Sequence, residues 1–257
     1  MSAGWQNIDD AEQEAASVLQ PELGEHLQLA AMAFNLIGLA VNLAPEVPQS
    51  QLRPSRGVST CLLVRLSNDI RCAIKLAVQG YPLQTASLIS SAYEVAYTIA
   101  AIGSDDELAQ EWAEHDDPTR LFRKVEDLTR AWFQWLGVDD PQKQAKNAYL
   151  RYRQLCLAKH SNPLLQGQHG HRVTEDEILA INGPDESEQG IRESWFALET
   201  AVHLSCIALT SFVDNHVAPE ERARMVDLVN QMGAGRQQLA RKAMERWGNE
   251  DPFPGRW

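Results

Sequence analysis

The chain has 257 residues, of which 44% are hydrophobic, so it can bury a substantial core as one large domain or as a main domain with a small appendage. Its formal net charge of −12 argues against a protein that binds bulk nucleic acid or anionic membrane, because their phosphate groups would repel it. A small local basic site remains compatible with that charge. The four cysteines stand singly on apolar helical patterns without a C-x-x-C pair, which predicts buried thiols in a reducing compartment. They are Cys61, Cys72, Cys156 and Cys206.

The first residues are acidic and lack the basic start of a signal peptide, so we expect a cytoplasmic protein. Residues 1–20 predict a weakly helical leader. Pro21 is suited to the first position of a helix, which we expect to run to about Leu43. The most membrane-like window, residues 27–44, is interrupted at seven-residue intervals by Gln28, Asn35 and Asn42. This polar stripe predicts a buried helix of a soluble protein, with no membrane partner.

A stretch with three prolines and little hydrophobicity, residues 44–57, is the clearest internal boundary. It divides the chain into a leader, helix and linker (1–56), a helical core (57–217) and a C-terminal broken helix and tail (218–257). The break in the last helix is expected at the Gly-Ala-Gly sequence of residues 233–235.

Within the core, residues 83–102 are apolar nearly all round, which is typical of a helix at the centre of a bundle. We expect this helix to be the most buried one. Its polar residues fall on one stripe at intervals of three and four: Gln84, Ser87, Ser91, Glu94 and Thr98. Three tryptophans are expected in the core or at an interface: Trp132, Trp135 and Trp195.

Strand signals are nearly absent, with no alternating β-branched run and no Asn-Gly hairpin. The periodicity instead predicts at least seven helices and no sheet of three or more strands. The fold class is therefore all-α, a multi-helix bundle with long central antiparallel helices.

Arg153 and His160 stand seven positions apart on the helix expected from residue 141, which Pro163 cannot continue. That spacing places them about 20° apart around the helix and roughly 10 Å apart along it, at the edge of an apolar seam. A cation and an imidazole so placed could hold one phosphate. The alternative is that the arginine is a solvated surface residue and the histidine interacts favourably with the helix C-terminus.

Glu94 is a carboxylate inside an otherwise apolar helix, which is costly unless it is paired. One interpretation is a buried ion pair with Arg65 or Arg71 on the preceding helix. The other is that Glu94, with Ser91, faces the same cleft as His160.

Two histidines, His169 and His171, occur in a loop, and two Glu/His pairs have helical i,i+4 spacing. These pairs are Glu111 with His115 and Glu199 with His203. A metal site needs three or four converging ligands, and none can be assembled from these residues. We expect neither a metal nor another cofactor, and the sequence has no phosphate-binding loop or nucleophile turn.

Residues 58–212 resemble the HEPN superfamily of helical bundles, by way of related bacterial domains. The resemblance rests on the turn Gly80-Tyr81-Pro82-Leu83-Gln84-Thr85-Ala86 into the helix that bears Glu94, and on the later stretch Tyr152-Arg153-Gln154-Leu155-Cys156-Leu157-Ala158-Lys159-His160. HEPN proteins place an arginine, a neighbouring polar residue and a histidine on a late helix, and Arg153, Gln154 and His160 match these three. The glutamine departs from the asparagine, aspartate or histidine that is more frequent there.

The resemblance implies a HEPN-like core and a homodimer whose paired helices bring two arginines and two histidines into one cleft. In active members this cleft is a metal-independent RNA-cutting site. Substrate contacts would then come from Glu94, Ser91, Lys159 and Arg151, and the dimer contact would lie near Tyr149, Tyr152 and Arg153.

Two functions remain open. The first is a metal-independent endoribonuclease, a toxin or defence effector with a cognate antitoxin or partner protein. The second is a non-catalytic helical interaction or ligand-sensing domain, which the acidic composition favours.

Overall fold

The chain forms an all-α bundle in a computed structural model that describes residues 2–117, 121–160, 171–173, 178–180 and 183–248. Within these ranges there are eight α-helices, which agrees with the prediction of at least seven, and one hairpin of two short strands, which was not predicted. The helices are α1 (Ser2–Leu43), α2 (Pro54–Val78), α3 (Pro82–Ile102), α4 (Asp106–Ala113), α5 (Val125–Trp135), α6 (Pro141–Lys159), α8 (Glu188–His216) and α9 (Pro219–Trp247). A 3₁₀ turn covers Gln49–Gln51, and β1 (His171–Val173) pairs antiparallel with β2 (Ile178–Ala180).

Proline and capping residues start these helices. A proline occupies the first turn of α2, α3, α6 and α9, where its missing N–H removes no intrahelical bond. The side chains of Asp105, Asp140 and Ser187 accept hydrogen bonds from the first-turn N–H groups of α4, α6 and α8. Short connections then reverse the chain between α2 and α3 and between α8 and α9, so these neighbours are antiparallel.

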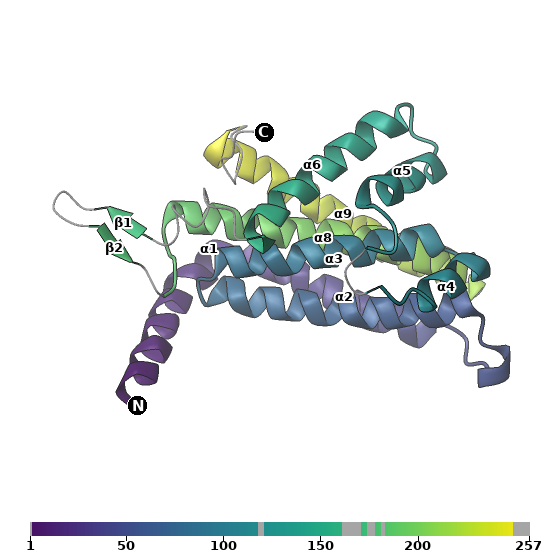
Figure 1. The fold of residues 1–257 in the computed structure, drawn as a ribbon, viewed down its shortest axis with the longest axis horizontal. Helices are drawn as coiled ribbons and strands as arrows, with labels where there is room; N and C mark the ends of the chain where they lie inside the picture. The colour runs from purple at the N-terminus through teal and green to yellow at the C-terminus, as the bar shows by residue number, and fades with distance from the viewer. Residues whose placement is uncertain (1, 118–120, 161–170, 174–177, 181–182, 249–257) are drawn as a thin grey trace.

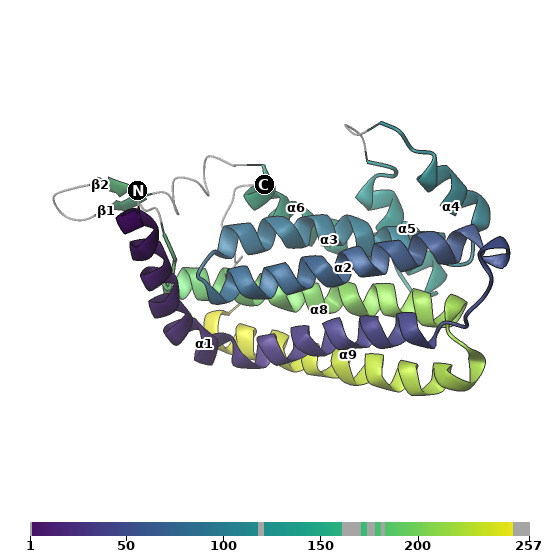
Figure 2. The same cartoon turned by 90° about the horizontal axis from the view of Figure 1, so that it is seen from below.

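The long helices α1, α2, α3, α8 and α9 lie side by side, and α5 and α6 cross over one side of these five (Figure 1). Viewed from below, α3, α2, α8, α1 and α9 follow one another across the bundle (Figure 2). Helix α8 packs against α1, α2, α3 and α9. It buries 19 of its 29 residues, against 13 of 21 for α3. The expectation that α3 would be the most buried helix is therefore wrong by a small margin.

The helices at both ends of the chain are longer and less interrupted than expected. Helix α1 begins at Ser2 and continues through Pro21, instead of starting there, and its N-terminal part bends away from the bundle (Figure 2). Proline within a helix removes one hydrogen bond and bends the axis, which accounts for the direction of this segment. Helix α9 runs unbroken through residues 233–235. Both terminal helices contribute to the same hydrophobic cluster as the central ones.

The polar stripe of Gln28, Asn35 and Asn42 is exposed and the opposite, apolar side of α1 faces the bundle. Helix α1 is thus a surface helix with one apolar side, and the expectation of a buried helix is wrong. By length and composition alone, two helical segments could cross a membrane: residues 7–43 within α1, and α8. Within the chain, 78% of the apolar window of α8 is buried, against 33% for that of α1. Core helices of soluble proteins pass the same test, so this composition is weak evidence for a membrane span.

Of the tryptophans expected in the core or at an interface, Trp132 is in the core. Trp135 is 55% exposed and stacks on Trp132 at a centroid distance of 5.0 Å, so it is not a core residue and its place at an interface stays a prediction. The expectation that all four cysteines are buried is wrong. Cys61 and Cys72 are exposed on α2, and the other two cysteines are partly buried. All four thiols are free. Cysteines can be exposed on the side of a helix that does not pack against the bundle.

Candidate functional site

Helix α6 is held on α3 by a network of polar contacts centred on Glu94. One carboxylate oxygen of Glu94 accepts hydrogen bonds from the Tyr152 hydroxyl at 2.8 Å and from the Lys159 ammonium at 3.0 Å. The Tyr93 hydroxyl donates to the main-chain carbonyl of Ala148 at 2.7 Å. Burial, followed by hydrogen bonds to Cys156 and Glu94, raises the pKa of Tyr152 well above its usual value, so the hydroxyl remains a donor. These contacts fix the orientation of α6.

The expected ion pair between Glu94 and Arg65 or Arg71 is therefore wrong. Arg65 is exposed on α2 and pairs with Asp69 at 3.8 Å, and Arg71 is also exposed. The stripe that carries Glu94 faces α6 instead of α2, so its cation comes from a residue 65 positions further along the chain. Ser91 is half-buried one turn before Glu94 on the same stripe.

Arg153 and His160 are both exposed at the outer side of α6, whereas Gln154 is half-buried. His160 is the C-terminal cap of the helix, and its main-chain N–H donates to the carbonyl of Cys156 at 3.0 Å. The structure thus joins Lys159 and Glu94, and leaves the imidazole of the next residue at the surface. Tyr152, expected near a dimer contact, is instead in the core of its own chain, against Tyr93.

The charge of α6 differs from that of the chain as a whole. Its 19 residues contain five lysines or arginines and no aspartate or glutamate, within a protein of net charge −12. These are Lys143, Lys146, Arg151, Arg153 and Lys159. An anion that approaches this helix therefore meets a locally positive surface.

A second network joins three helices through Glu199 of α8, whose side chain is only 8% exposed. Its two carboxylate oxygens accept hydrogen bonds from Arg151 of α6 at 2.8 Å and from Arg236 of α9 at 3.0 Å. Burial and the nearby charges of Arg236 and Arg151 hold the pKa of His203 well below its usual value, so this imidazole is neutral. The pairing was not predicted, because no local pattern links residues so far apart in sequence.

Both glutamates of the two Glu/His pairs considered as metal ligands are bonded to arginines. Glu199 is neutralised by two arginines, and Glu111 accepts two hydrogen bonds from Arg123 at 2.6 and 2.7 Å. Among the described residues, no group of three or more histidines, cysteines or carboxylates is placed to bind a metal ion. His169 lies outside the described ranges, and His171 begins β1.

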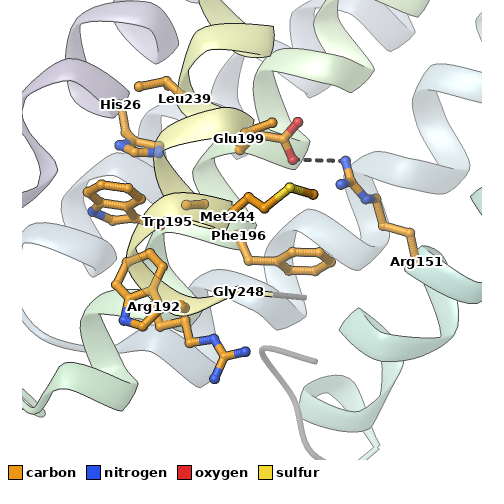
Figure 3. Close-up of a pocket in the computed structure, with 12 residues that line it drawn as sticks. His26, Arg151, Arg192, Trp195, Phe196, Glu199, Leu239, Met244 and Gly248 are labelled. Atoms are coloured by element: carbon orange, nitrogen blue, oxygen red, sulfur yellow. Dashed lines mark hydrogen bonds and ion pairs between the residues drawn. The ribbon is translucent and has the colours of Figure 1, made fainter. Parts of the chain in front are cut away.

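Next to the Glu199 network is a pocket of about 260 Å³ between α1, α6, α8 and α9 (Figure 3). Aromatic and apolar side chains from α8 and α9 form most of its wall, and Arg151 and Arg192 provide cations. Its lining consists of His26, Arg151, Arg192, Trp195, Phe196, Glu199, Leu239, Ala240, Ala243, Met244, Trp247 and Gly248. Of these, sequence reasoning had named only Arg151, Trp195 and Glu199, each for another reason.

The geometry therefore presents two candidate sites that share helix α6: the exposed Arg153 and His160, and the pocket that Arg151 lines. Comparisons of the chain with protein-family models, with curated proteins and with solved structures find no match.

Proposed function

We propose that the chain is a cytoplasmic, metal-independent endoribonuclease that acts as a homodimer through Arg153 and His160. The observation that carries this proposal is the position of these two residues on a helix rich in cations, with both side chains exposed. Two other basic residues of α6, Arg151 and Lys159, are engaged by Glu199 and Glu94. They orient the helix, on which the side chains of Arg153 and His160 are exposed to solvent.

Each residue has a role that suits its chemistry. The Arg153 guanidinium would bind the scissile phosphate and stabilise the charge that develops on it. The His160 imidazole would remove the proton from the 2′-hydroxyl or donate one to the leaving oxygen. In a homodimer, two copies of α6 side by side would supply two His160 side chains. One would accept the proton of the 2′-hydroxyl and the other would donate a proton to the leaving oxygen. Glu94, Ser91 and Gln154 would position α6 and the substrate around them.

The test is RNA cleavage by purified variants. His160→Ala and Arg153→Ala should each abolish cleavage and leave the melting temperature nearly unchanged, because exposed side chains contribute under about 1 kcal/mol to stability. Loss of a contact to the transition state costs on the order of 3 kcal/mol, or more than a hundredfold in rate. Lys146→Ala removes another exposed cation of α6 and should retain activity. EDTA should have no effect.

The opposite result would be equally informative. If His160→Ala and Arg153→Ala destabilise the protein, and the wild-type chain cleaves no RNA, both residues are structural and the enzyme proposal is withdrawn.

A second function, a non-catalytic ligand-sensing domain, is supported by the pocket, because its wall includes a residue of α6. A ligand that contacts Arg151 would act on the helix that also carries Arg153 and His160. Residues 151 and 160 are separated by roughly 13 Å along the helix axis.

A further inference from the structure

The tryptophan side of the pocket between α1, α6, α8 and α9 already packs against other side chains of the protein. The ring centroid of Trp195 lies 4.3 Å from that of His26 and 5.6 Å from the guanidinium carbon of Arg246. The same guanidinium carbon lies 4.8 Å from the ring centroid of Trp247. The two indoles also meet edge to face, with centroids 4.7 Å apart. Both tryptophans are therefore held in place by contacts within the chain.

The side of the pocket near the end of α9 is more open. Met244 is 57% exposed, and Ala240 and Gly248 are exposed as well. Phe196 and Ala243, which line the same side, are half-buried. Figure 3 shows Phe196 and Met244 next to the end of α9 at Gly248. Exposed apolar surface gathered in a concave site is a feature of places where another apolar group packs.

Gly248 ends α9 and turns the chain at the edge of this open side. Its N–H donates to the carbonyl of Met244 at 2.8 Å, which closes the last turn of the helix. Its φ of 68° and ψ of −154° lie in a region that glycine adopts readily and residues with a side chain rarely adopt. The chain thus leaves the axis of α9 at a residue that is itself part of the pocket lining.

The nine residues that follow Gly248, residues 249–257, lie outside the described ranges, and their sequence includes an aromatic group suited to the pocket. Phe253 stands between Pro252 and Pro254, five residues after Gly248. Five residues span at most about 18 Å, so the phenyl ring can reach a pocket that begins at Gly248. Each proline restricts its own φ and the conformation of the residue before it, so this stretch has less freedom to lose on docking. The entropy cost of closing so short a loop is small as well.

From these features we propose that the pocket is occupied by residues 249–257 of the same chain, with the Phe253 ring packed against Phe196 and Met244. A pocket of about 260 Å³ is smaller than those that bind drug-sized molecules, and suits a single aromatic side chain. An attached segment needs less intrinsic affinity than a free ligand, because the length of the linking chain sets its effective concentration at the pocket. The proposal rests on neither RNA cleavage nor ligand sensing. A free ligand of this pocket would have to displace the segment.

The proposal is tested by fluorine NMR of the full chain with 4-fluorophenylalanine in place of Phe253. Burial against an aromatic ring should shift the fluorine resonance away from its position in the urea-unfolded chain. Ala240→Trp places a large side chain in the pocket from an exposed position of α9, so the resonance should move to the unfolded position. Ala234→Trp is the matched control and should leave the shift unchanged, because Ala234 is exposed on the same helix and lies outside the pocket lining. The samples contain no RNA, so this outcome is separate from that of the cleavage assay.

Dilution separates docking within one chain from docking onto a second copy. The shifted fraction should stay constant as the protein is diluted, because an intramolecular contact does not depend on protein concentration. A fraction that falls on dilution would place the segment in the pocket of another copy and overturn the proposal. The proposal would also be overturned by a resonance at the unfolded position in the native chain, by an unchanged shift in folded Ala240→Trp, or by equal displacement in Ala234→Trp. Circular dichroism establishes that each variant folds, and Ala243→Trp decides the question if Ala240→Trp does not fold.

Discussion

Two histidines in the interior show how single residues make the stability of this protein depend on pH. His26 is 2% exposed and His216 is 6% exposed. Burial is the main reason that the pKa of each falls from 6.5 to about 4. Nearby charges act less strongly: Lys242 lowers the pKa of His26 further, and Glu25 opposes this. Both imidazoles are therefore neutral in the folded protein at neutral pH.

This predicts loss of stability in mild acid. Between pH 6.5 and 4 the unfolded chain binds a proton at His26 and the folded chain does not, so the free energy of unfolding falls as the pH drops through this window. A depression from 6.5 to about 4 corresponds to a loss on the order of 3 kcal/mol. His26→Leu and His26→Gln should both flatten this dependence in urea unfolding at pH 7, 5.5 and 4.5. A slope equal to that of the wild type in both variants would contradict the prediction.

At the scale of elements, helix α9 depends on two glycines with different surroundings. A Cβ atom at Gly235 would lie 2.8 Å from the Cδ2 atom of Leu29, so this glycine lets α9 approach α1 closely. A Cβ atom at Gly233 would meet only the Cys206 sulfur at 4.0 Å, an ordinary contact distance. The Gly-Ala-Gly sequence therefore serves helix packing, where the sequence alone predicted a helix break.

The two positions should respond in opposite directions. Gly235→Ile should destabilise the protein by about 1–3 kcal/mol, because the branched side chain forces α9 and α1 apart. Gly233→Ala should stabilise it by about 0.5–1 kcal/mol, because alanine has the higher helix propensity and space is available. Chemical unfolding of the two variants measures both changes. A stable Gly235→Ile variant would mean that the approach of α9 to α1 tolerates more bulk than the packing indicates.

For the whole molecule, the face formed by α5 and α6 is the place where a second copy could dock. Helices α5 and α6 stand out from the five long helices (Figure 1). They expose Trp135, Leu136 and Leu150 by 55%, 43% and 37%. Leu150 is on the helix that carries Arg153, and Trp135 and Leu136 are at the end of the neighbouring helix α5. Exposed apolar side chains beside Arg153 and His160 fit the proposed paired cleft. Tyr152 cannot contribute, since its hydroxyl is bonded to Glu94 within the chain.

We predict a homodimer through this face. Sedimentation at micromolar concentration should show about twice the 28.7 kDa mass of one chain. Trp135→Glu should shift it to monomer, because a charge in an apolar contact remains unpaired. Val64→Glu changes an apolar residue on α2 that is 49% exposed and should leave the dimer intact. A wild-type monomer would refute the assembly. A dimer lost only with Val64→Glu would place the contact on α2.

Local patterns in the sequence determined the fold class and most helix starts. Prolines at first-turn positions and the caps Asp105 and Ser187 mark helix starts because these effects act within one turn. The apolar seam of α6 could be predicted as well, and with it the exposed position of Arg153 and His160 at its edge. Periodicity states which side of a helix is apolar, because the side-chain direction repeats every 3.6 residues.

Which residues contact each other depends on how the helices pack. Glu94 is paired with Lys159 instead of an arginine of the neighbouring helix, and Glu199 joins Arg151 to Arg236. Pro21 and Gly235 looked like helix boundaries, and packing of α1 and α9 onto the core carried both helices through them. The pocket could not be predicted from the sequence either, because it depends on how distant helices pack. Its wall comes from four helices, and the angles at which they cross depend on all the side chains packed between them.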